Sequence, residues 1–307
     1  MTDHTYIYQI YDKIFKKILT LSSTAVINLI NGLFETTYPP DSTITYNWTE
    51  FENGELKRIL ADTILTINGV HCYHMEAQMT EDEDIVFRVF EYGYYHADRN
   101  RSITQANTVP DSFPADNNIS SCDLIFPEPK IIYLSSSPNT PDEYILNLHF
   151  GSQGTFSYRV TTFKFLETSV EELNKRKMII LIPFQLLKLR MLLAKNRSDD
   201  NLEALKNLIK NDIIKSIEDN LQLGNITLDD ARKLKRLTHR LYQHIYSHYE
   251  EMEALNDMTD ESLMLDIDII EKQHEEEMAQ AIAKLTAEKD AEIASLKAQL
   301  DALQQTD

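Results

Sequence analysis

The sequence predicts a mixed α/β protein, in which a central β-sheet flanked by helices is followed by an all-α region that ends in a coiled coil. Three observations predict this architecture. Up to about residue 195, β-prone runs with turn signals alternate with segments of helical spacing. Beyond residue 196 there is no strand signal. From Asp260 the chain is charged and Ala-rich, with apolar residues three and four apart. We therefore expect three parts, at residues 1–195, 196–256 and 257–307.

Composition limits the class of protein. The chain has 307 residues, 42% of them hydrophobic, which is enough for one large domain or two small ones. Its first residues lack the basic and then apolar run of a signal peptide, and no apolar run is long enough to span a membrane. The two cysteines, Cys72 and Cys122, provide no disulfide framework and no zinc spacing. We expect a cytoplasmic protein without a membrane partner.

The net charge of −19 is unevenly distributed. Residues 250–307 contain 17 Asp and Glu against four Lys, and so carry −13 of the total. The first 249 residues carry only about −6. The acidity belongs mostly to the tail, so it does not exclude a nucleic-acid partner for the rest of the chain.

The N-terminal segment is predicted to be helical. Apolar residues recur at helical spacing over Tyr6–Leu19, and Ser22-Ser23-Thr24 can cap a second helix that runs to Phe34. Pro39-Pro40 ends that helix. The β-branched and aromatic run Thr43–Phe51 then predicts the first strand of an antiparallel meander.

The next two strands form the hairpin on which the functional hypothesis depends. The runs Ala61–Ile67 and Val70–Gln78 flank Asn68-Gly69, the dipeptide favoured in turns that need φ > 0 at both central residues. One strand carries Asp62, and its partner carries Glu76 and Gln78 on one face. Apolar residues occupy both faces of these strands, so the two acids are expected to be buried. Buried acids must be paired, protonated or bound to a cation, which makes a divalent metal site a hypothesis.

The register decides whether the two acids can act together. With a strict two-residue loop, Ile67 faces Val70 and the acids lie on opposite faces. With a three-residue loop or a bulge, Ile67 faces His71 and Asp62 lies opposite Glu76. The metal hypothesis requires the second register.

The rest of the first part alternates helices, strands and one long loop. The helix predicted at Glu81–Arg101 carries Arg88 and Tyr92 as i, i+4 neighbours. A capping box at Ser169 and Glu172 predicts a short helix. The other expectations are a loop at Ser102–Pro129, strands at Lys130–Leu134, Tyr144–Phe150, Phe156–Leu166 and Met178–Ile182, and a helix at Phe184–Leu193.

The second part is predicted to be helical throughout. Leu202–Leu223 is amphipathic and ends at Gly224, and Thr227 caps a further helix that runs to about Leu255. Its basic residues Lys233, Lys235, Arg236 and Arg240 are expected to form a solvated face, with nucleic-acid contact as the alternative. The tail is expected to associate with itself or with a partner helix, and a single solvated helix is the alternative.

Three segments resemble the PD-(D/E)XK nuclease superfamily, and within it the Rpn family of recombination-promoting nucleases and putative transposases. The opening Tyr11-Asp12-Lys13-Ile14-Phe15-Lys16-Lys17 is similar to the family's D-x-x-F-K segment, and Ile27-Asn28-Leu29-Ile30-Asn31-Gly32-Leu33 is similar to its apolar–Asn helix. Asp62 with Glu76-Ala77-Gln78, followed by Arg88 and Tyr92, is similar to its D…E-x-Q…R-x-x-x-Y signature. The resemblance covers about residues 6–195. Ala61 and Gln78 stand where the superfamily name has Pro and Lys.

The resemblance implies metal-assisted hydrolysis of phosphodiesters. Asp62, Glu76 and the Ala77 carbonyl would bind Mg²⁺, with Mn²⁺ as a substitute, and Gln78 would orient the attacking water. Lys13, Lys16, Arg88 and Tyr92 would contact the substrate, and the expected partner is DNA. His71 and His74 are read as structural or peripheral, because the Cys pair that a His-x-Glu zinc site needs is missing.

Two other functions remain open at this stage. The first is a nuclease-fold protein without turnover that acts as a DNA-binding or regulatory module and assembles through its C-terminal helices into a dimer. The second is a purely structural coiled-coil protein, which the buried acids disfavour. The sequence does not distinguish a DNA substrate from an RNA substrate.

Overall fold

In the computed structural model, the described residues are 11, 14–47, 50–52, 58–60, 63–104, 121–195, 198–246 and 289. The chain divides into two compact units, Met1–His248 and Tyr249–Asp307. The boundary predicted after residue 195 falls inside the first unit. The predicted coiled coil at 257–307 lies, apart from Lys289, outside the described residues.

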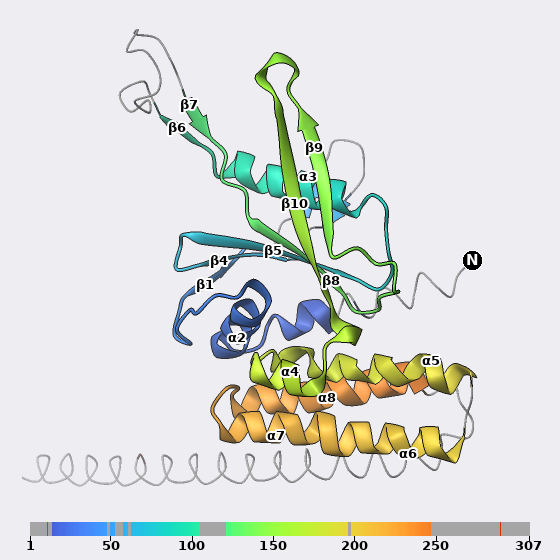
Figure 1. The fold of residues 1–307 in the computed structure, drawn as a ribbon. Coiled ribbons are helices and arrows are strands. Elements are labelled where there is room, and N and C mark those ends of the chain that lie inside the picture. Colours follow the sequence, from blue (N-terminus) through green and yellow to red (C-terminus); the bar gives the residue numbers. More distant parts are fainter. Residues whose placement is uncertain are drawn as a thin grey trace, which may run out of the picture. The chain divides into compact units, whose positions relative to one another are not determined.

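A six-stranded mixed sheet lies at the centre of the first unit (Figure 1). Its inner strands β5, β8 and β10 are parallel, and the outer pairs β1–β4, β4–β5 and β10–β9 are antiparallel. This arrangement confirms the predicted mixed α/β class. In spatial order the strands are β1 (Ile44–Tyr46), β4 (Thr63–Ile67), β5 (His71–Gln78), β8 (Glu128–Tyr133), β10 (Thr155–Lys164) and β9 (Glu143–His149).

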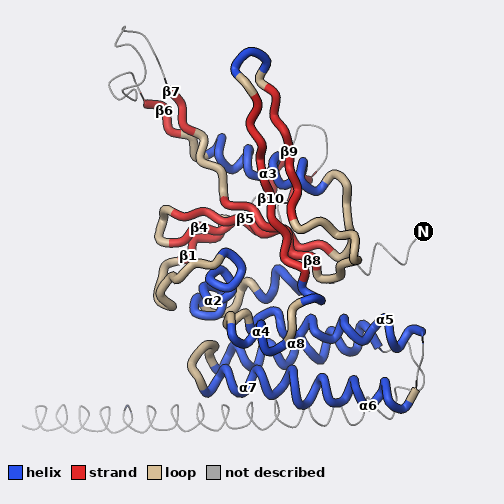
Figure 2. The backbone as a smooth tube through the Cα atoms, viewed as in Figure 1, coloured by secondary structure: helices blue, strands red, loops and turns tan. Residues whose placement is uncertain are grey.

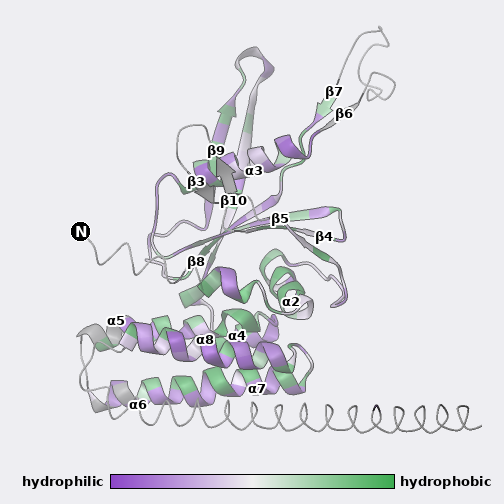
Figure 3. Ribbon diagram, turned by 180° about the vertical axis from the view of Figure 1, so that it is seen from behind, coloured by the Kyte–Doolittle hydropathy of each residue, from purple (hydrophilic) through white to green (hydrophobic). Residues whose placement is uncertain are grey.

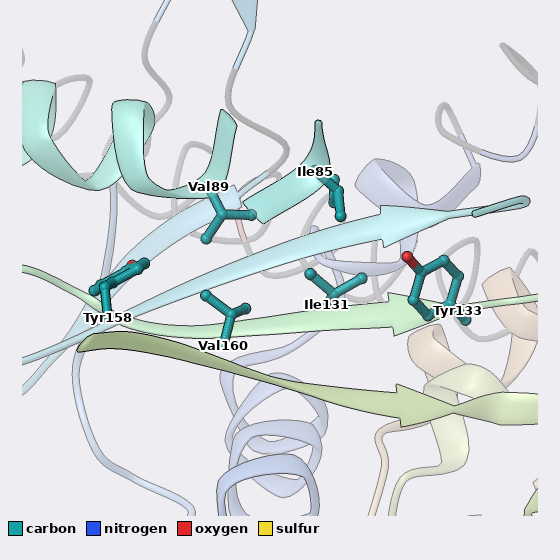
Figure 4. Packing of buried hydrophobic residues seen from close by; sticks show 6 residues of the cluster. All are labelled: Ile85, Val89, Ile131, Tyr133, Tyr158 and Val160. Atoms are coloured by element: carbon teal, nitrogen blue, oxygen red, sulfur yellow. The ribbon is translucent and has the colours of Figure 1, made fainter. Parts of the chain in front are cut away.

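Helix α3 (Ile85–Arg99) covers one face of this sheet. Figure 4 shows its Ile85 and Val89 directed at apolar side chains of the strands below. The helix can pack this way because its apolar residues recur every three to four positions. The strand side chains in this cluster are Ile131, Tyr133, Tyr158 and Val160.

Helix α2 (Ser23–Phe34) covers the opposite face. The Phe34 ring packs on Tyr73 of β5, with ring centroids 4.5 Å apart. Lys130 of β8 donates from Nζ to the carbonyl of Leu33 over 2.7 Å. Side chains therefore alternate along β5 and β8, with one set meeting α3 and the other meeting α2.

A layer of helices follows the sheet in the sequence (Figure 2). At its centre is the 3₁₀ helix η3 (Ile179–Leu186), whose eight residues are all buried. Figure 3 shows polar and apolar stripes along the helices of this layer, as expected for helices that each bury one face. They are α4 (Val170–Lys175), α5 (Leu187–Lys195), α6 (Asp199–Asn207), the π-helical segment η4 (Leu208–Ile214), α7 (Lys215–Gln222) and α8 (Leu228–Tyr246).

The buried carboxylate of Asp230 joins this layer to α2. It accepts from both the backbone N–H (2.9 Å) and the hydroxyl (2.7 Å) of Thr227, which precedes α8. It also accepts from the backbone N–H (2.7 Å) and the hydroxyl of Ser22, the N-cap of α2. A second bond runs beside it, from the Asn28 amide to the carbonyl of Asn225 over 2.9 Å. One side chain thus satisfies donors at the start of two helices, one of which begins 208 residues before it in the sequence.

Two predicted strands are corrected by the structure. The run Met178–Ile182 is not a strand, because Ile179–Leu186 forms a 3₁₀ helix. Its apolar residues are buried on all sides by helices, and a short, uniformly apolar run has no period that separates a strand from a buried helix. The run Thr43–Phe51 is two strands in different sheets, since β1 ends at Tyr46 and β2 (Glu50–Glu52) pairs with β3 (Arg58–Leu60).

The predicted loop Ser102–Pro129 also contains strands. Its ends form the antiparallel pair β6 (Ser102–Thr104) and β7 (Ser121–Asp123), and β8 begins at Glu128. Residues 105–120 lie outside the described residues. The remaining short elements are the 3₁₀ turns η1 (Gly151–Gln153) and η2 (Phe165–Glu167).

Gly32 of α2 is a sensitive position. A Cβ there would lie 2.9 Å from the carbonyl oxygen of Arg176 and would overlap Cγ of Met178. We expect Gly32→Ala to destabilise the protein by about 1–3 kcal/mol, because the backbone of residue 176 cannot rotate away. Gly93→Ala in α3 is the matched control, since its Cβ would meet side chains and no backbone atom, with the Phe126 ring at 3.1 Å and Cδ of Pro127 at 3.6 Å. Urea denaturation measures both, and equal stabilities of the two variants would contradict this packing.

Asp230 supports a second prediction. Asp230→Ala leaves the donors of Ser22 and Thr227 without their acceptor, so we expect a loss of about 3 kcal/mol in the free energy of unfolding. Asp229→Ala is the control, because its exposed carboxylate pairs, among the residues the structure describes, with Lys233 alone, over 2.6 Å. That variant should lose less than about 1 kcal/mol. Thermal and urea denaturation compare the two, and similar losses would show that the double cap contributes little.

Candidate active site

The β4–β5 hairpin has the register that the metal hypothesis requires. Ile67 pairs with His71 and Thr63 with Met75, so the loop contains three residues, 68–70. Asn68 and Gly69 have φ of 52° and 69°, as the Asn-Gly signal predicts. Val70 is the additional residue. Its N–H donates to the carbonyl of Ile67 over 3.1 Å, while its side chain is 71% exposed.

One face of β5 and one stripe of α3 meet in three successive polar contacts. Arg88 lies beside Glu76, Tyr92 beside His74, and His96 beside Cys72. The contacts recur along both elements because four residues of a helix rise about 6 Å and two residues of a strand rise about 6.6 Å. Every second residue of the strand therefore meets every fourth residue of the antiparallel helix.

Glu76 is the centre of the candidate site. It is 4% exposed, and its Oε1 accepts from the Gln78 amide over 3.1 Å. Nη2 of Arg88 lies 3.6 Å from the same oxygen. Burial lowers the pKa of Arg88, but the carboxylates of Glu76 and Asp82 more than offset this, so the pKa is raised and the guanidinium is charged. A charged group therefore faces a buried carboxylate that also touches an amide donor.

His74 lies directly beside this carboxylate. Its side chain is fully buried, and its Nε2 is 3.8 Å from Oε2 of Glu76. Burial lowers the pKa of His74 to about 4, so the imidazole is neutral near pH 7. Among the described residues neither ring nitrogen has a hydrogen-bond partner. The site thus holds a neutral imidazole with unused hydrogen-bonding capacity next to Glu76.

Cys72 and His96 form the third contact. The Cys72 sulfur lies 3.3 Å from Nε2 of His96. Burial raises the pKa of the thiol, and burial together with the nearby His74 lowers the pKa of His96. Both shifts favour the neutral forms, so this pair is not the thiolate–imidazolium couple of a cysteine nucleophile.

The structure brings together four of the predicted site residues, Glu76, Gln78, Arg88 and Tyr92. Ala77 lies between two of them on β5. Lys16 is partly buried on the helical segment 14–18. Asp62 and Lys13 lie outside the described residues. Among the residues that are described, no three His, Cys, Asp or Glu side chains are grouped so as to hold a metal ion.

Several residues of the site were not assigned to it from the sequence. His74, expected to be structural or a peripheral residue of the site, lies beside Glu76. Asp82, in the loop before α3, holds Arg88 by a hydrogen bond. The spacing of Arg88, Tyr92 and His96 at i, i+4 and i+8 is the signal that would have found the polar stripe of α3.

A pocket lies at the N-terminal end of β5, away from Glu76. It encloses about 660 Å³ and is lined by His71, Cys72, Tyr73 and Lys130 among others. Neither Glu76 nor Gln78 lines it. The buried acid is therefore not part of this pocket.

Comparisons of the chain with protein-family models, with curated proteins and with solved structures find no match. Within the described residues, no helix has the length and apolar character needed to cross a membrane.

The contact between Arg88 and Glu76 can be measured by a double-mutant cycle. We expect Arg88→Met and Glu76→Gln to show a favourable coupling of about 1 kcal/mol in unfolding free energy, because Glu76 is buried while Arg88 is partly screened by water. The exposed pair Arg159–Glu143, at 2.7 Å, is the control and should couple by less than about 0.5 kcal/mol. A coupling near zero for Arg88 and Glu76 would show that the guanidinium does not stabilise the buried acid.

Proposed function

We propose that the protein is a Mg²⁺-dependent nuclease of the PD-(D/E)XK type, similar to the Rpn family, that hydrolyses phosphodiester bonds of DNA. The observation that carries this proposal is the register of the β4–β5 hairpin. Ile67 pairs with His71, and the same register continued by one residue beyond Thr63 would set position 62 opposite Glu76. The two acids of the motif would then share one face of the hairpin.

The order of the elements supports the same reading. A helical segment at 14–18 and α2 precede β1, β4 and β5, and α3 then leads to β8, which is parallel to β5. Apart from β2 and β3, which lie between β1 and β4 and pair with each other, the order helix–helix–strand–strand–strand–helix resembles that of the nuclease superfamily. The Glu-x-Gln strand is an inner strand, and the helix that carries Arg88 packs on its polar face.

The donor set suits a hard divalent cation. Glu76 offers carboxylate oxygens on a largely buried strand, and Asp62 would supply a second carboxylate. Bound Mg²⁺ would supply a Lewis acid that activates water and offsets charge on the phosphate. Gln78 already donates to Glu76, so its amide would orient both the carboxylate and a nearby water. Arg88, which contacts Asp82 and Glu76, would supply a cation for a substrate phosphate.

A second candidate function rests on the Arg88 contact. Because a guanidinium already lies 3.6 Å from Glu76, the acid has a cationic partner of its own and does not need a metal to be buried. Gln78 also lacks the ammonium of the superfamily's Lys. Both features fit a nuclease-fold protein without turnover that binds DNA or regulates a partner, with dimer formation through the C-terminal helices.

Cleavage assays separate the two candidates. We expect the wild-type protein to nick supercoiled DNA in Mg²⁺ or Mn²⁺, and Asp62→Ala and Glu76→Gln to reduce the rate by at least about 10²-fold, because each removes a metal ligand. Gln78→Ala should retain more activity. Glu143→Gln, which removes a carboxylate from the edge strand β9, is the matched control and should cleave normally.

Metal binding is followed separately from cleavage. Mn²⁺ should raise the melting temperature of the wild-type protein but not that of Asp62→Ala. If Glu76→Gln folds and nicks DNA at the wild-type rate, the assigned site is wrong. If the wild-type protein binds DNA and Mn²⁺ without cleaving any substrate, the second candidate is correct.

A further inference from the structure

A pocket outside the candidate active site is lined mainly by basic residues. It encloses about 200 Å³, and its lining residues, which we call the basic pocket, are Lys17, Leu21, Lys233, Arg236, Leu237 and Arg240. Leu21, which precedes α2, and Leu237 of α8 line this pocket together with four cationic side chains. None of its lining residues is acidic.

Helical geometry explains how these residues gather. Positions 233, 236, 237 and 240 are spaced i, i+3, i+4 and i+7, so they share one face of α8. Lys17 and Leu21 come from the N-terminal segment, more than 200 residues away in the sequence. The Asp230 double cap fixes the start of α8 beside Ser22, one residue after Leu21. The same interaction that joins the helices therefore also assembles the pocket.

The cations of α8 and of the basic pocket differ in their burial and pairing. Lys235 is 2% exposed and binds Glu218 over 2.8 Å, which corrects the expectation that it belongs to a solvated face. Lys233 is paired with Asp229. Arg240 and Lys17 are exposed, and among the described residues neither forms an ion pair. Two charges at this pocket are thus available to an external anion.

The clustering is unusual for this chain. The first 249 residues carry a net charge of about −6, yet four of their cations converge on one small pocket. Like charges held this close repel one another, and a bound anion relieves the repulsion. Exposed Lys and Arg around a concave surface are the usual way in which proteins bind phosphate groups.

We propose that the basic pocket binds a backbone phosphate of duplex DNA and provides a contact separate from the Glu76 site. None of its lining residues is aromatic, so it offers no platform on which the bases of a single strand could stack. Lys and Arg contacts to phosphate carry no sequence information, so the contact adds affinity rather than sequence preference. The choice of DNA as the partner rests on the proposed function.

Equilibrium binding of a short fluorescein-labelled duplex, measured by anisotropy in EDTA over a range of salt concentrations, tests this proposal. We expect the double variant Lys17→Gln/Arg240→Gln to bind at least about tenfold more weakly at low salt. The slope of log K against log salt should fall by about two, because each phosphate contact contributes about 0.9. Lys175→Gln/Lys210→Gln removes the same charge from exposed helical positions elsewhere and should bind as the wild type does. Lys17→Arg/Arg240→Lys keeps the charge and should retain binding.

Each other outcome overturns the proposal. These are no binding by the wild-type protein, equal loss in both Gln double variants, or an unchanged salt slope. Loss of binding to phosphatidylserine vesicles but not to DNA would identify a lipid headgroup instead, and competition by millimolar inorganic phosphate alone would identify a small-anion site. Melting temperatures exclude misfolding as the cause. Because EDTA removes the metal, this assay measures DNA binding without cleavage, so a failure of the nuclease assignment is seen separately in the cleavage assay.

Discussion

The buried carboxylate of Asp230 is the interaction on which the arrangement of the first unit most depends. It accepts four hydrogen bonds, two from the residue that precedes α8 and two from the N-cap of α2. Helix starts leave unpaired N–H groups that must find acceptors when they are buried. Here one carboxylate accepts from donors at the start of two helices, so the first turns of α2 and α8 are held next to each other. The sheet lies on one side of α2 and η3 on the other, and the basic pocket opens next to the cap.

The parts of the fold that the sequence predicted well are those with a distinctive local signal. The Asn68-Gly69 turn, the Ser22 cap of α2 and the Ser169 cap of α4 each specify a backbone conformation through one or two residues, and all three are present. The run Met178–Ile182 failed because its conformation is set by the helices around it. A β-strand and a 3₁₀ helix buried on all sides have the same apolar composition, and only tertiary contacts distinguish them. The pairing of β6 with β7 was missed for a similar reason, since the signal lies in residues far apart.

The candidate site was partly predictable. Glu76, Gln78, Arg88 and Tyr92 were named from their motif, and the structure gathers them because the rise of α3 matches the rise of β5. The role of His74 could not be predicted from its position in the sequence. The alternation of side chains along a strand predicts which face of the sheet His74 lies on, but not which helix packs over it. Lys235 was misjudged likewise, because its helical spacing resembles that of its exposed neighbours. The sequence left open whether the hairpin loop has two or three residues. In the structure it has three, and Val70 is the third.

The long separation between the two ends of the double cap has a consequence for synthesis of the chain. Ser22 emerges from translation 208 residues before the carboxylate that caps it. At typical elongation rates of about 5–20 residues per second, this interval lasts roughly 10–40 s. During that time the sheet strands and α3 are made and can pair, while α2 has neither its cap nor the buried η3 against its outer side. Until its later partners are made, α2 keeps apolar surface exposed. We therefore expect α2 to be the element for which chaperone contact before chain release matters most.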